Sequence, residues 1–195
     1  PMKFALIQMP TTKDKQENLQ IALEYIARAA AAGARVAILP EMFCCPYSNA
    51  AFPVFAETAD GMLCTALARA AKENHLTLVA GSIPERCGDK LYNTSFVFDE
   101  NGRQIARHRK IHLFDAHIDG GQHFRESAVL SAGWEPTTFL VDGIRIGLCI
   151  ENPLHGNRDM CLQVFLVHMG LKGLHILNGH TLAVFPPCAL ALVGC

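Results

Sequence analysis

Short apolar runs and longer amphipathic segments alternate over the first part of the chain. Residues 4–7 and 36–39 are apolar runs of strand length, and residues 76–83 form a third that is rich in β-branched side chains. Residues 14–32 and 63–74 instead repeat apolar side chains at helical spacing. The pattern therefore predicts a strand, a helix, a strand, a helix and a strand, in that order.

Strand-like segments then flank two short turns. The first turn is Asp99-Glu100-Asn101-Gly102, between strands expected at residues 91–98 and 104–108, and its Asn-Gly pair is a strong hairpin signal. The second turn is Asp142-Gly143, which divides the strand-like residues 137–150. Both segments predict antiparallel hairpins.

The pattern after these hairpins predicts one more helix and one more strand. Residues 161–169 fit a helix that ends at Gly170, and residues 174–177 fit a strand. No repeat, low-complexity segment or linker divides the sequence. Alternating strands and helices followed by hairpins are typical of an α/β layered domain with a mixed sheet. We therefore expect residues 1–195 to form a single domain.

Composition agrees with a globular chain and excludes some partners. A chain of 195 residues is long enough to bury a sizeable core. Its residues are 50% hydrophobic and 18% charged, as is typical of globular proteins. The formal net charge of −1 gives no general attraction to nucleic acid or to an anionic membrane. No stretch approaches the roughly 18 apolar residues of a membrane span, and no signal-peptide layout occurs. We expect neither a nucleic-acid nor a membrane partner.

The eight cysteines do not read as a disulfide framework. Their spacing is irregular apart from Cys44–Cys45, and no C-x-x-C pair suggests zinc. A chain of this length with a rich aliphatic core does not need covalent cross-links. We therefore predict free, mostly buried thiols and a location in the reducing cytoplasm.

Three segments could carry chemistry. Glu41, in Leu39-Pro40-Glu41-Met42-Phe43, follows the end of a predicted buried strand, where α/β sheets place their sites and where desolvation favours a general base. Lys110, in a basic segment that runs from His108 to Asp115, could stabilise an oxyanion. Cys149, near the end of a predicted strand, could be a nucleophile.

Each segment also has an ordinary interpretation. Glu41 could be a surface-loop glutamate, the basic segment could be a solvated stretch or a weak nucleic-acid patch, and Cys149 could be a buried, inert thiol. His108 and His112 have the spacing of a helical metal pair, but their segment ends a hairpin, so we expect no metal. The sequence has no P-loop, no G-x-G-x-x-G and no G-x-S-x-G. We expect no cofactor.

Taken together and in order, the segments resemble the nitrilase (carbon–nitrogen hydrolase) superfamily, especially its omega-amidase-like branch. The resemblance covers residues 3–150, and residues 151–195 diverge. Each motif is modestly specific, whereas five in the correct order are a strong signal. The motifs are Leu39-Pro40-Glu41-Met42-Phe43, Gly81-Ser82-Ile83-Pro84-Glu85, Tyr92-Asn93-Thr94-Ser95, Arg109-Lys110-Ile111-His112-Leu113-Phe114-Asp115, and Gly120-Gly121 followed by Phe124-Arg125-Glu126-Ser127.

This resemblance implies a fold, an activity and roles for single residues. The fold would be a four-layer α-β-β-α sandwich in a homo-oligomer. The activity would be hydrolysis of small amides through a cysteine thiolate, with release of ammonia and a carboxylic acid. Glu41 would be the base, Lys110 the catalytic lysine and Glu126 the supporting glutamate. Tyr47, Phe114 and His117 would line the substrate pocket, with core packing as the alternative.

The nucleophile motif departs from the family pattern. Aligned strictly from Gly147, the nucleophile position is Glu151, and Cys149 falls two residues early. Counting back from Arg158 gives Leu154 instead. Neither count falls on a cysteine, and Cys149, two residues before the strict position, is the candidate nucleophile. The alternative is a catalytically impaired relative or a truncated fragment that binds a small amide or carboxylate or pairs with another subunit.

The end of the sequence departs from the family as well. After Asn178, residues 179–195 do not resemble the family, whose members continue through further strands and helices. The resemblance therefore implies a sandwich that is incomplete at its C-terminal end. Such a sandwich would leave apolar surface exposed.

Overall fold

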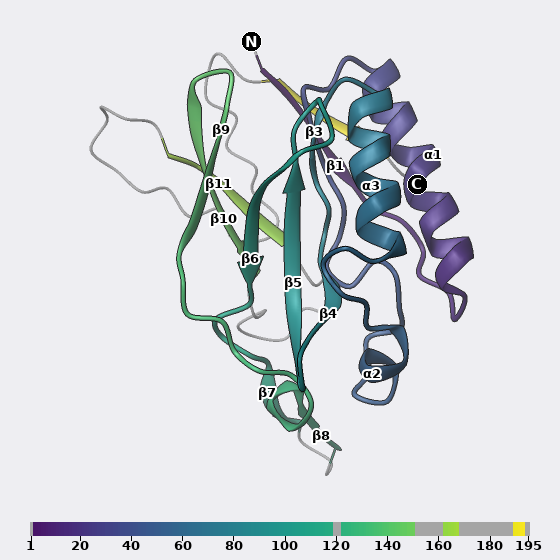
Figure 1. Ribbon diagram of the computed structural model, residues 1–195, viewed down its shortest axis with the longest axis vertical. Helices are drawn as coiled ribbons and strands as arrows, with labels where there is room; N and C mark the ends of the chain where they lie inside the picture. Colours follow the sequence, from purple (N-terminus) through teal and green to yellow (C-terminus); the bar gives the residue numbers. More distant parts are fainter. Residues whose placement is uncertain (1, 119–121, 151–161, 168–188, 194–195) are drawn as a thin grey trace.

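The computed structural model describes residues 2–118, 122–150, 162–167 and 189–193, which form a helical layer and two main sheets (Figure 1). A seven-stranded sheet lies between the helices on one side and a three-stranded sheet on the other. The α/β layered fold with a mixed sheet is confirmed. The described residues supply one helical layer and both sheet layers of the predicted α-β-β-α sandwich.

The seven-stranded sheet combines parallel and antiparallel strands. Its parallel half has the order β12, β1, β2, β3, and β3 then pairs with an antiparallel strand, β5. Strand β5 also pairs antiparallel with β4 and β6. The strands are β1 (Lys3–Ile7), β2 (Val36–Ile38), β3 (Thr77–Val79), β4 (Ile83–Cys87), β5 (Lys90–Phe98), β6 (Gln104–Arg109) and β12 (Ala189–Val193).

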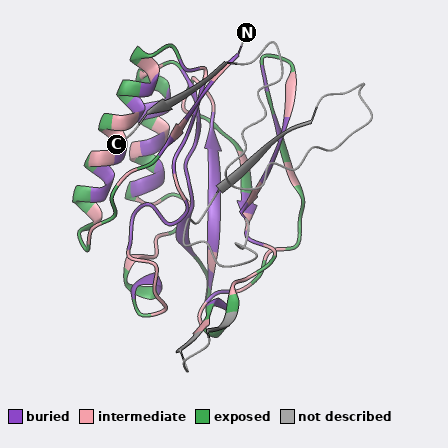
Figure 2. Cartoon of the chain, turned by 180° about the vertical axis from the view of Figure 1, so that it is seen from behind, coloured by how far each residue is buried: buried purple, intermediate pink, exposed green. Residues whose placement is uncertain are grey.

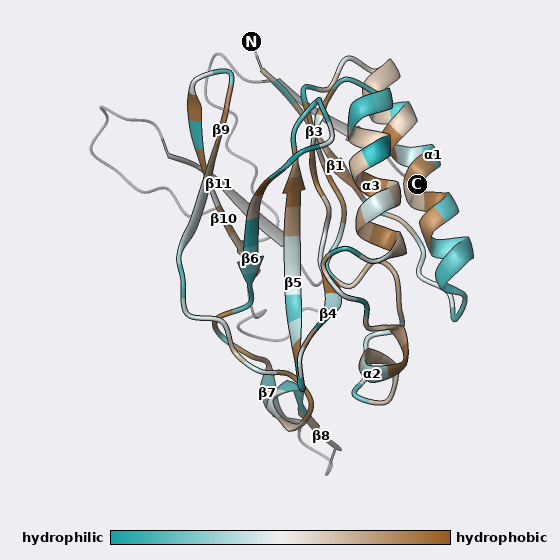
Figure 3. Ribbon diagram, in the orientation of Figure 1, coloured by the Kyte–Doolittle hydropathy of each residue, from teal (hydrophilic) through white to brown (hydrophobic). Residues whose placement is uncertain are grey.

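Helices α1 (Lys15–Ala31) and α3 (Met62–Glu73) cover one face of this sheet. Helix α1 begins where the Asp14 side chain accepts hydrogen bonds from two backbone N–H groups, and it is followed by Gly33 at φ +80°. Both helices alternate hydrophilic and hydrophobic residues (Figure 3), and their buried residues pack on the sheet (Figure 2). This core includes Leu19, Ala22, Ile26, Leu63, Leu67, Ala5, Ala37 and Leu78.

The three-stranded sheet covers the opposite face. It contains β9 (Thr137–Val141), β10 (Ile144–Ile150) and β11 (Leu162–Val167), all antiparallel. Asp142 and Gly143 both have positive φ, as a two-residue hairpin turn requires, so the second predicted hairpin is confirmed. The contact between the sheets is apolar and consists of Met2, Phe4, Val36, Ile38, Val79, Val97, Phe139, Val141, Ile146 and Leu148.

The prediction of a helix over residues 161–169 is wrong. Residues Leu162–Val167 form strand β11, which pairs along the edge of β10. The segment is short and rich in β-branched and aromatic residues, so a neighbouring strand edge decides its conformation. Strand β12 was also not predicted, and it extends the parallel half of the first sheet beside β1.

The prediction of a single strand over residues 76–83 is wrong, because this range holds β3 and only the first residue of β4. Strand β3 ends at Val79, and β4 starts at Ile83 in antiparallel pairing with β5. The chain turns at Gly81, which has φ +49° and lies against the carbonyl oxygen of Pro40. Only glycine fits such a close backbone approach at positive φ.

Several short elements near the site carried no clear signal in the sequence. They are α2 (Ala51–Phe55), the hairpin of β7 (Asp115–Ile118) and β8 (Gln122–Arg125), and the 3-10 helix η1 (Glu126–Ala128). Three-to-five-residue elements show too little periodicity to be recognised from sequence alone.

Some predictions fall outside the described residues. They concern Glu151, Leu154, the strand at residues 174–177, the side chain of His117 and the completeness of the C-terminal layer. Within the described ranges, no helix has both the length and the apolar character needed to cross a membrane.

Candidate active site

Glu41 lies in the loop that follows β2, and the backbone of this loop is held by the connection between β3 and β4. Met42 has φ +50°, which is unusual for a residue with a side chain. Its N–H donates to the buried hydroxyl of Ser82 at 3.0 Å. Gly81, beside Ser82, lies against the Pro40 carbonyl. The Gly81-Ser82 turn therefore fixes the backbone on both sides of Glu41.

Lys110 is the first residue after β6, and its backbone is held on both sides. Its N–H donates to the Asn93 carbonyl at 2.8 Å, and its carbonyl accepts from the Gly133 N–H at 2.8 Å. A side chain at Gly133 would collide with the Arg109 carbonyl, so the loop packs closely against this strand end. Lys110 is only 1% exposed.

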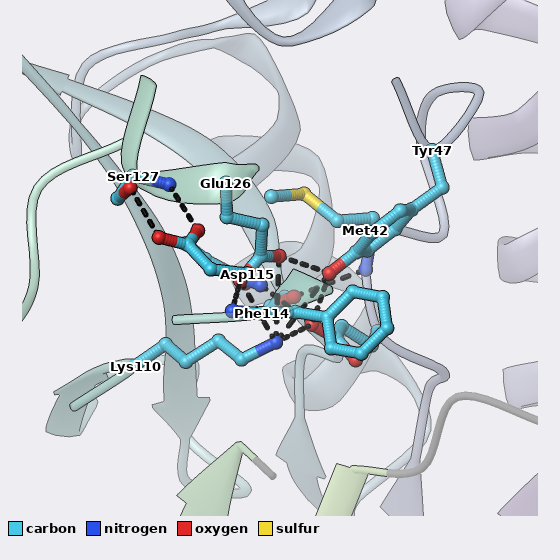
Figure 4. A network of polar contacts seen from close by, with 10 residues as sticks. Met42, Tyr47, Lys110, Phe114, Asp115, Glu126 and Ser127 are labelled. Carbon is cyan, nitrogen blue, oxygen red and sulfur yellow. Dashed lines mark hydrogen bonds and ion pairs between the residues drawn. The ribbon is translucent and has the colours of Figure 1, made fainter. Parts of the chain in front are cut away.

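Glu126 opens the 3-10 helix η1 and is fully buried. Its Oε2 accepts the Phe114 N–H at 2.6 Å, and its own N–H donates to the Phe114 carbonyl at 2.9 Å. Asp115 accepts hydrogen bonds from the N–H and the hydroxyl of Ser127 on the same turn (Figure 4). These contacts tie the Phe114-Asp115 segment to η1 and aim Glu126 inward.

The structure brings Glu41, Lys110 and Glu126 together in one buried cluster. The Lys110 ammonium lies 3.0 Å from Glu41 Oε1 and 3.2 Å from Glu126 Oε2. The Tyr47 hydroxyl makes a very short contact with Glu126 Oε1 and lies 3.4 Å from Glu41 Oε1. Figure 4 shows Lys110, Glu126 and Tyr47 pointing toward one another. Two carboxylates thus share one ammonium away from solvent.

Burial makes Glu41 more basic than an ordinary glutamate. Desolvation raises the pKa of Glu41, and the charge of Glu126 raises it further, while the Lys110 ammonium and a hydrogen bond from Asn93 offset part of this rise. Burial and the two carboxylates also raise the pKa of the Tyr47 phenol, so Tyr47 stays protonated. The cluster can therefore accept a proton at Glu41 and donate hydrogen bonds from Lys110 and Tyr47.

The predicted lining residues Tyr47 and Phe114 belong to an aromatic group beside these carboxylates. The Tyr47 ring lies 5.3 Å from Phe52 and 5.6 Å from Phe124, and the rings of Phe114 and Phe124 are 5.9 Å apart. Tyr47 also uses its hydroxyl in the cluster, so it contributes both to packing and to the polar site. Such rings lower the local dielectric and strengthen the ion pairs.

A second ion pair, half-buried, lies beside Lys110, and the sequence alone did not reveal it. The Arg109 guanidinium donates two hydrogen bonds of 2.8 Å to Glu85 and stacks on Tyr92, and Thr94 donates to Glu85 at 2.7 Å. Burial alone would raise the pKa of Glu85, but the hydrogen bonds from Arg109 and Thr94 lower it below its usual value. These residues lie on the three adjacent strands β4, β5 and β6, so only the pairing register of the strands could have indicated that Arg109 contacts Glu85.

Cys149 lies in the second sheet, on β10. It is half-buried and pairs with Gln163 of β11 in a register that continues without interruption from Arg145 to Ile150. Ile146 and Leu148 face the first sheet, so the two-residue period of a strand places Cys149 on the opposite face of β10.

The other cysteines of the described part agree with the prediction of free, mostly buried thiols. Cys44, Cys45 and Cys64 are buried free thiols, and Cys87 is an exposed one. Burial raises the pKa of Cys64 to about 12, which keeps it an unreactive thiol. Within the same part of the chain, no group of three or more His, Cys, Asp or Glu side chains could hold a metal ion.

Comparison with known proteins identifies the family of this fold and site. The family model described as carbon–nitrogen hydrolase matches residues 3–157, and the chain therefore belongs to the carbon–nitrogen hydrolase family. Within it, the chain is similar to the chloroplastic omega-amidase of Arabidopsis thaliana, with 42% identity over 179 residues. That match covers 89% of this chain and 47% of the relative, so this chain spans about half the length of that relative.

Solved structures support the same assignment. A Saccharomyces cerevisiae member of branch 10 of the nitrilase superfamily matches with a TM-score of 0.56 and 34% identity, over 66% of this chain and 46% of that chain. An amidase from Nesterenkonia sp. AN1, solved with acrylamide added to its active site cysteine, matches with a TM-score of 0.64 and 25% identity. This second match covers 76% of this chain and 57% of that chain.

Proposed function

We propose that the cluster of Glu41, Lys110 and Glu126 is a catalytic site that hydrolyses the carbon–nitrogen bond of a small amide. The observation that carries this proposal is the buried ion pair of Lys110 with two carboxylates, one of which is made more basic by its burial. Perturbed carboxylates of this kind are typical of general bases. The family membership and the similarity to an omega-amidase support the same reaction.

The proposed reaction is covalent. Glu41 takes the proton of a cysteine thiol, and the thiolate attacks the carbonyl carbon of the amide. Lys110 stabilises the negative charge on the carbonyl oxygen. The carbon–nitrogen bond then breaks, and ammonia leaves with a proton from Glu41. Water, activated by the same carboxylate, hydrolyses the thioester to release the carboxylic acid and restore the thiol.

Cys149 is the proposed nucleophile because it lies next to the end of β10, although the two-residue period of the strand places it on the face of β10 turned away from the first sheet. The active site cysteine named for the Nesterenkonia amidase supports a thiol in this role. Glu126 would hold Lys110 between the two carboxylates, and Tyr47 and Phe114 would border the substrate. No cofactor takes part in this scheme.

A second candidate function is binding without turnover, and the geometry of β10 favours it. The strict family register puts the nucleophile at position 151, two residues or about 6–7 Å beyond Cys149 in an extended strand. Proton transfer requires heavy atoms about 3 Å apart. Because β10 pairs regularly with β11 up to Ile150, no bulge in the described strand shortens this gap. The chain would then bind a small amide or carboxylate, or pair with a related subunit.

Thiol labelling combined with an ammonia assay separates the two candidates. The full chain and its Cys149→Ala variant are incubated with glutamine or a succinamate-like amide, and released ammonia is measured. If the chain hydrolyses amides, we expect the unchanged chain to release ammonia and the variant to release it at least about a thousandfold more slowly. We also expect a thiol reagent to label Cys149, and the amide to suppress this labelling. Labelling without ammonia release would support binding alone.

Assembly and location complete the proposal. We propose that the chain pairs with a second copy, as the family resemblance implies, and that it works in the cytoplasm, where the free thiols of Cys44, Cys45, Cys64 and Cys87 would stay reduced. Light scattering tests the first point and cell fractionation the second. A monomer, or a protein confined to an oxidising compartment, would contradict them.

A further inference from the structure

The hydrogen bonds to the Glu41 carboxylate are distributed unequally between its two oxygens. Oε1 accepts from Asn93 Nδ2 at 2.6 Å and from Lys110 Nζ at 3.0 Å, and the Tyr47 hydroxyl lies 3.4 Å from the same atom. Oε2 is buried and has no hydrogen-bond partner within the described part of the chain. One oxygen is thus saturated with donors, whereas the other keeps its lone pairs.

Asn93 makes the shortest of these contacts, and its own position is fixed. It is fully buried in β5, opposite Pro84 of β4. Its backbone carbonyl accepts the Lys110 N–H at 2.8 Å, so one residue binds the side chain of Glu41 and the backbone of Lys110. An ionised carboxylate only accepts hydrogen bonds, so the NH₂ end of the Asn93 amide must face Glu41.

We propose that Asn93 is a positioning residue that anchors Glu41 Oε1 and thereby makes Oε2 the oxygen that exchanges protons during the reaction. The inference rests on the proposed role of Glu41 as the general base. Lys110 alone cannot provide this anchor, because its ammonium is shared between Glu41 and Glu126. A neutral amide adds a directional hydrogen bond to Oε1 without adding charge to the cluster.

The anchor also has an effect on the ionisation of Glu41. Glu41 faces the charges of Lys110 and Glu126 and the phenol of Tyr47, and burial raises its pKa overall. The hydrogen bond from Asn93 stabilises the ionised carboxylate and so offsets part of that rise. Removing the amide should therefore raise the pKa of Glu41 further, while general damage to the fold should expose Glu41 and lower it.

The test is a pH titration of Glu41 in the full chain, followed by ¹³C NMR of labelled glutamate carboxyls and assigned with a Glu41→Gln variant. Asn93→Leu should raise the midpoint of Glu41 by about one pH unit. Thr94→Val is the matched control, because Thr94 is the next residue of β5, equally buried, and donates to a different buried glutamate, Glu85. This control should leave the midpoint of Glu41 unchanged.

Two further measurements keep the inference falsifiable if Asn93→Leu does not fold. Asn93→Asp preserves the shape of the side chain, and its carboxyl should titrate together with Glu41 in two steps, the upper one above the original midpoint. In the unchanged chain, the side-chain NH₂ signals of ¹⁵N-labelled Asn93 should shift with the same midpoint as the Glu41 carboxyl. Asn93 signals that ignore this titration, or an unmoved Glu41 midpoint in either folded variant, would overturn the inference.

These readouts do not depend on turnover. A chain that releases no ammonia but shows the coupled titration would retain Asn93 as the anchor of Glu41 and would contradict only the proposed hydrolysis. A chain that hydrolyses amides with an unaltered Glu41 midpoint in Asn93→Leu would retain the proposed function and contradict the anchor.

Discussion

At the scale of single residues, the site depends on a few buried polar contacts whose loss would leave a group unsatisfied. Glu41, Lys110 and Glu126 share their charges, so no member of the cluster is buried without a partner. The backbone beside Glu41 depends in turn on the hydroxyl of Ser82. When one partner of such a network is removed, the free energy of unfolding falls by more than the net contribution of the lost hydrogen bond, because the remaining group stays buried without a partner.

Ser82→Ala tests this dependence. The Met42 N–H would lose its acceptor, and we expect unfolding free energy to fall by about 1–3 kcal/mol, together with slower amide hydrolysis because Glu41 shifts. Ser95→Ala is the matched control, because Ser95 is equally buried and its hydroxyl has no hydrogen-bond partner in the described part of the chain. Denaturant unfolding compares the two, and equal losses would contradict the assigned role of Ser82.

The grouping of site residues was predictable from the sequence only where a motif carried it, and their catalytic roles stay predictions. Glu41, Lys110 and Glu126 were each assigned through the order of short motifs, and they do lie in contact. The contact of Asn93 with Glu41 spans 52 residues and crosses from β5 to the loop after β2, so no local pattern could indicate it. Cys149 stays a prediction, because its motif departs from the family pattern by two residues.

At the scale of elements, the connection between β3 and β4 determines where Glu41 points. The chain leaves β3 at Val79, turns at Gly81 against Pro40, and enters β4 at Ile83. This turn replaces what the sequence indicated as a single strand. A hydrophobic run predicts that a strand exists. It does not show where the strand breaks, because this break is caused by the close contact of Gly81 with Pro40, which is distant in the sequence.

Gly81→Ala tests the importance of this turn. Both positive φ and the collision with the Pro40 carbonyl oppose a side chain there, so we expect a loss of at least about 2 kcal/mol in unfolding free energy. Gly88→Ala is the matched control, because Gly88 also has positive φ but open space around it, and its cost should be about 1 kcal/mol. A smaller loss at Gly81 than at Gly88 would contradict the role of the close contact between Gly81 and Pro40.

Elements were predicted well where periodicity extended over many residues. Helices α1 and α3 and both hairpins lie within two residues of the expected bounds. The six-residue segment Leu162–Val167 was predicted as helix and is strand β11, because the open edge of β10 outweighs local propensity. Short segments take their conformation from neighbours that the local sequence does not show.

At the scale of the whole molecule, one apolar contact joins the two main sheets. Alternate residues of β9 and β10 face the first sheet, and the residues between them face away. Ile146 is fully buried in this contact, whereas Leu140, opposite Arg145 in the same hairpin, is 54% exposed. We therefore expect truncation of these two side chains of one hairpin to lower the free energy of unfolding by different amounts.

Truncation of each side chain to alanine tests the sandwich directly. Ile146→Ala should lower unfolding free energy by about 2–5 kcal/mol, because it leaves a cavity between the sheets. Leu140→Ala should change it by less than about 1 kcal/mol, since little burial is lost. Chemical denaturation measures both, and a similar loss for the two variants would contradict the packing of the second sheet on the first.

Glu41, in its ion pair with Lys110, is proposed as the base of an amide-hydrolysing site, and the pH profile of ammonia release is the measurement that tests this role. Because burial raises the pKa of Glu41 and the base must be ionised, the rate should rise with pH through a midpoint above that of an ordinary carboxyl. Glu41→Gln should lower the rate about a hundredfold or more and remove this rise. A folded Glu41→Gln variant that releases ammonia at the original rate and pH dependence would contradict the claim.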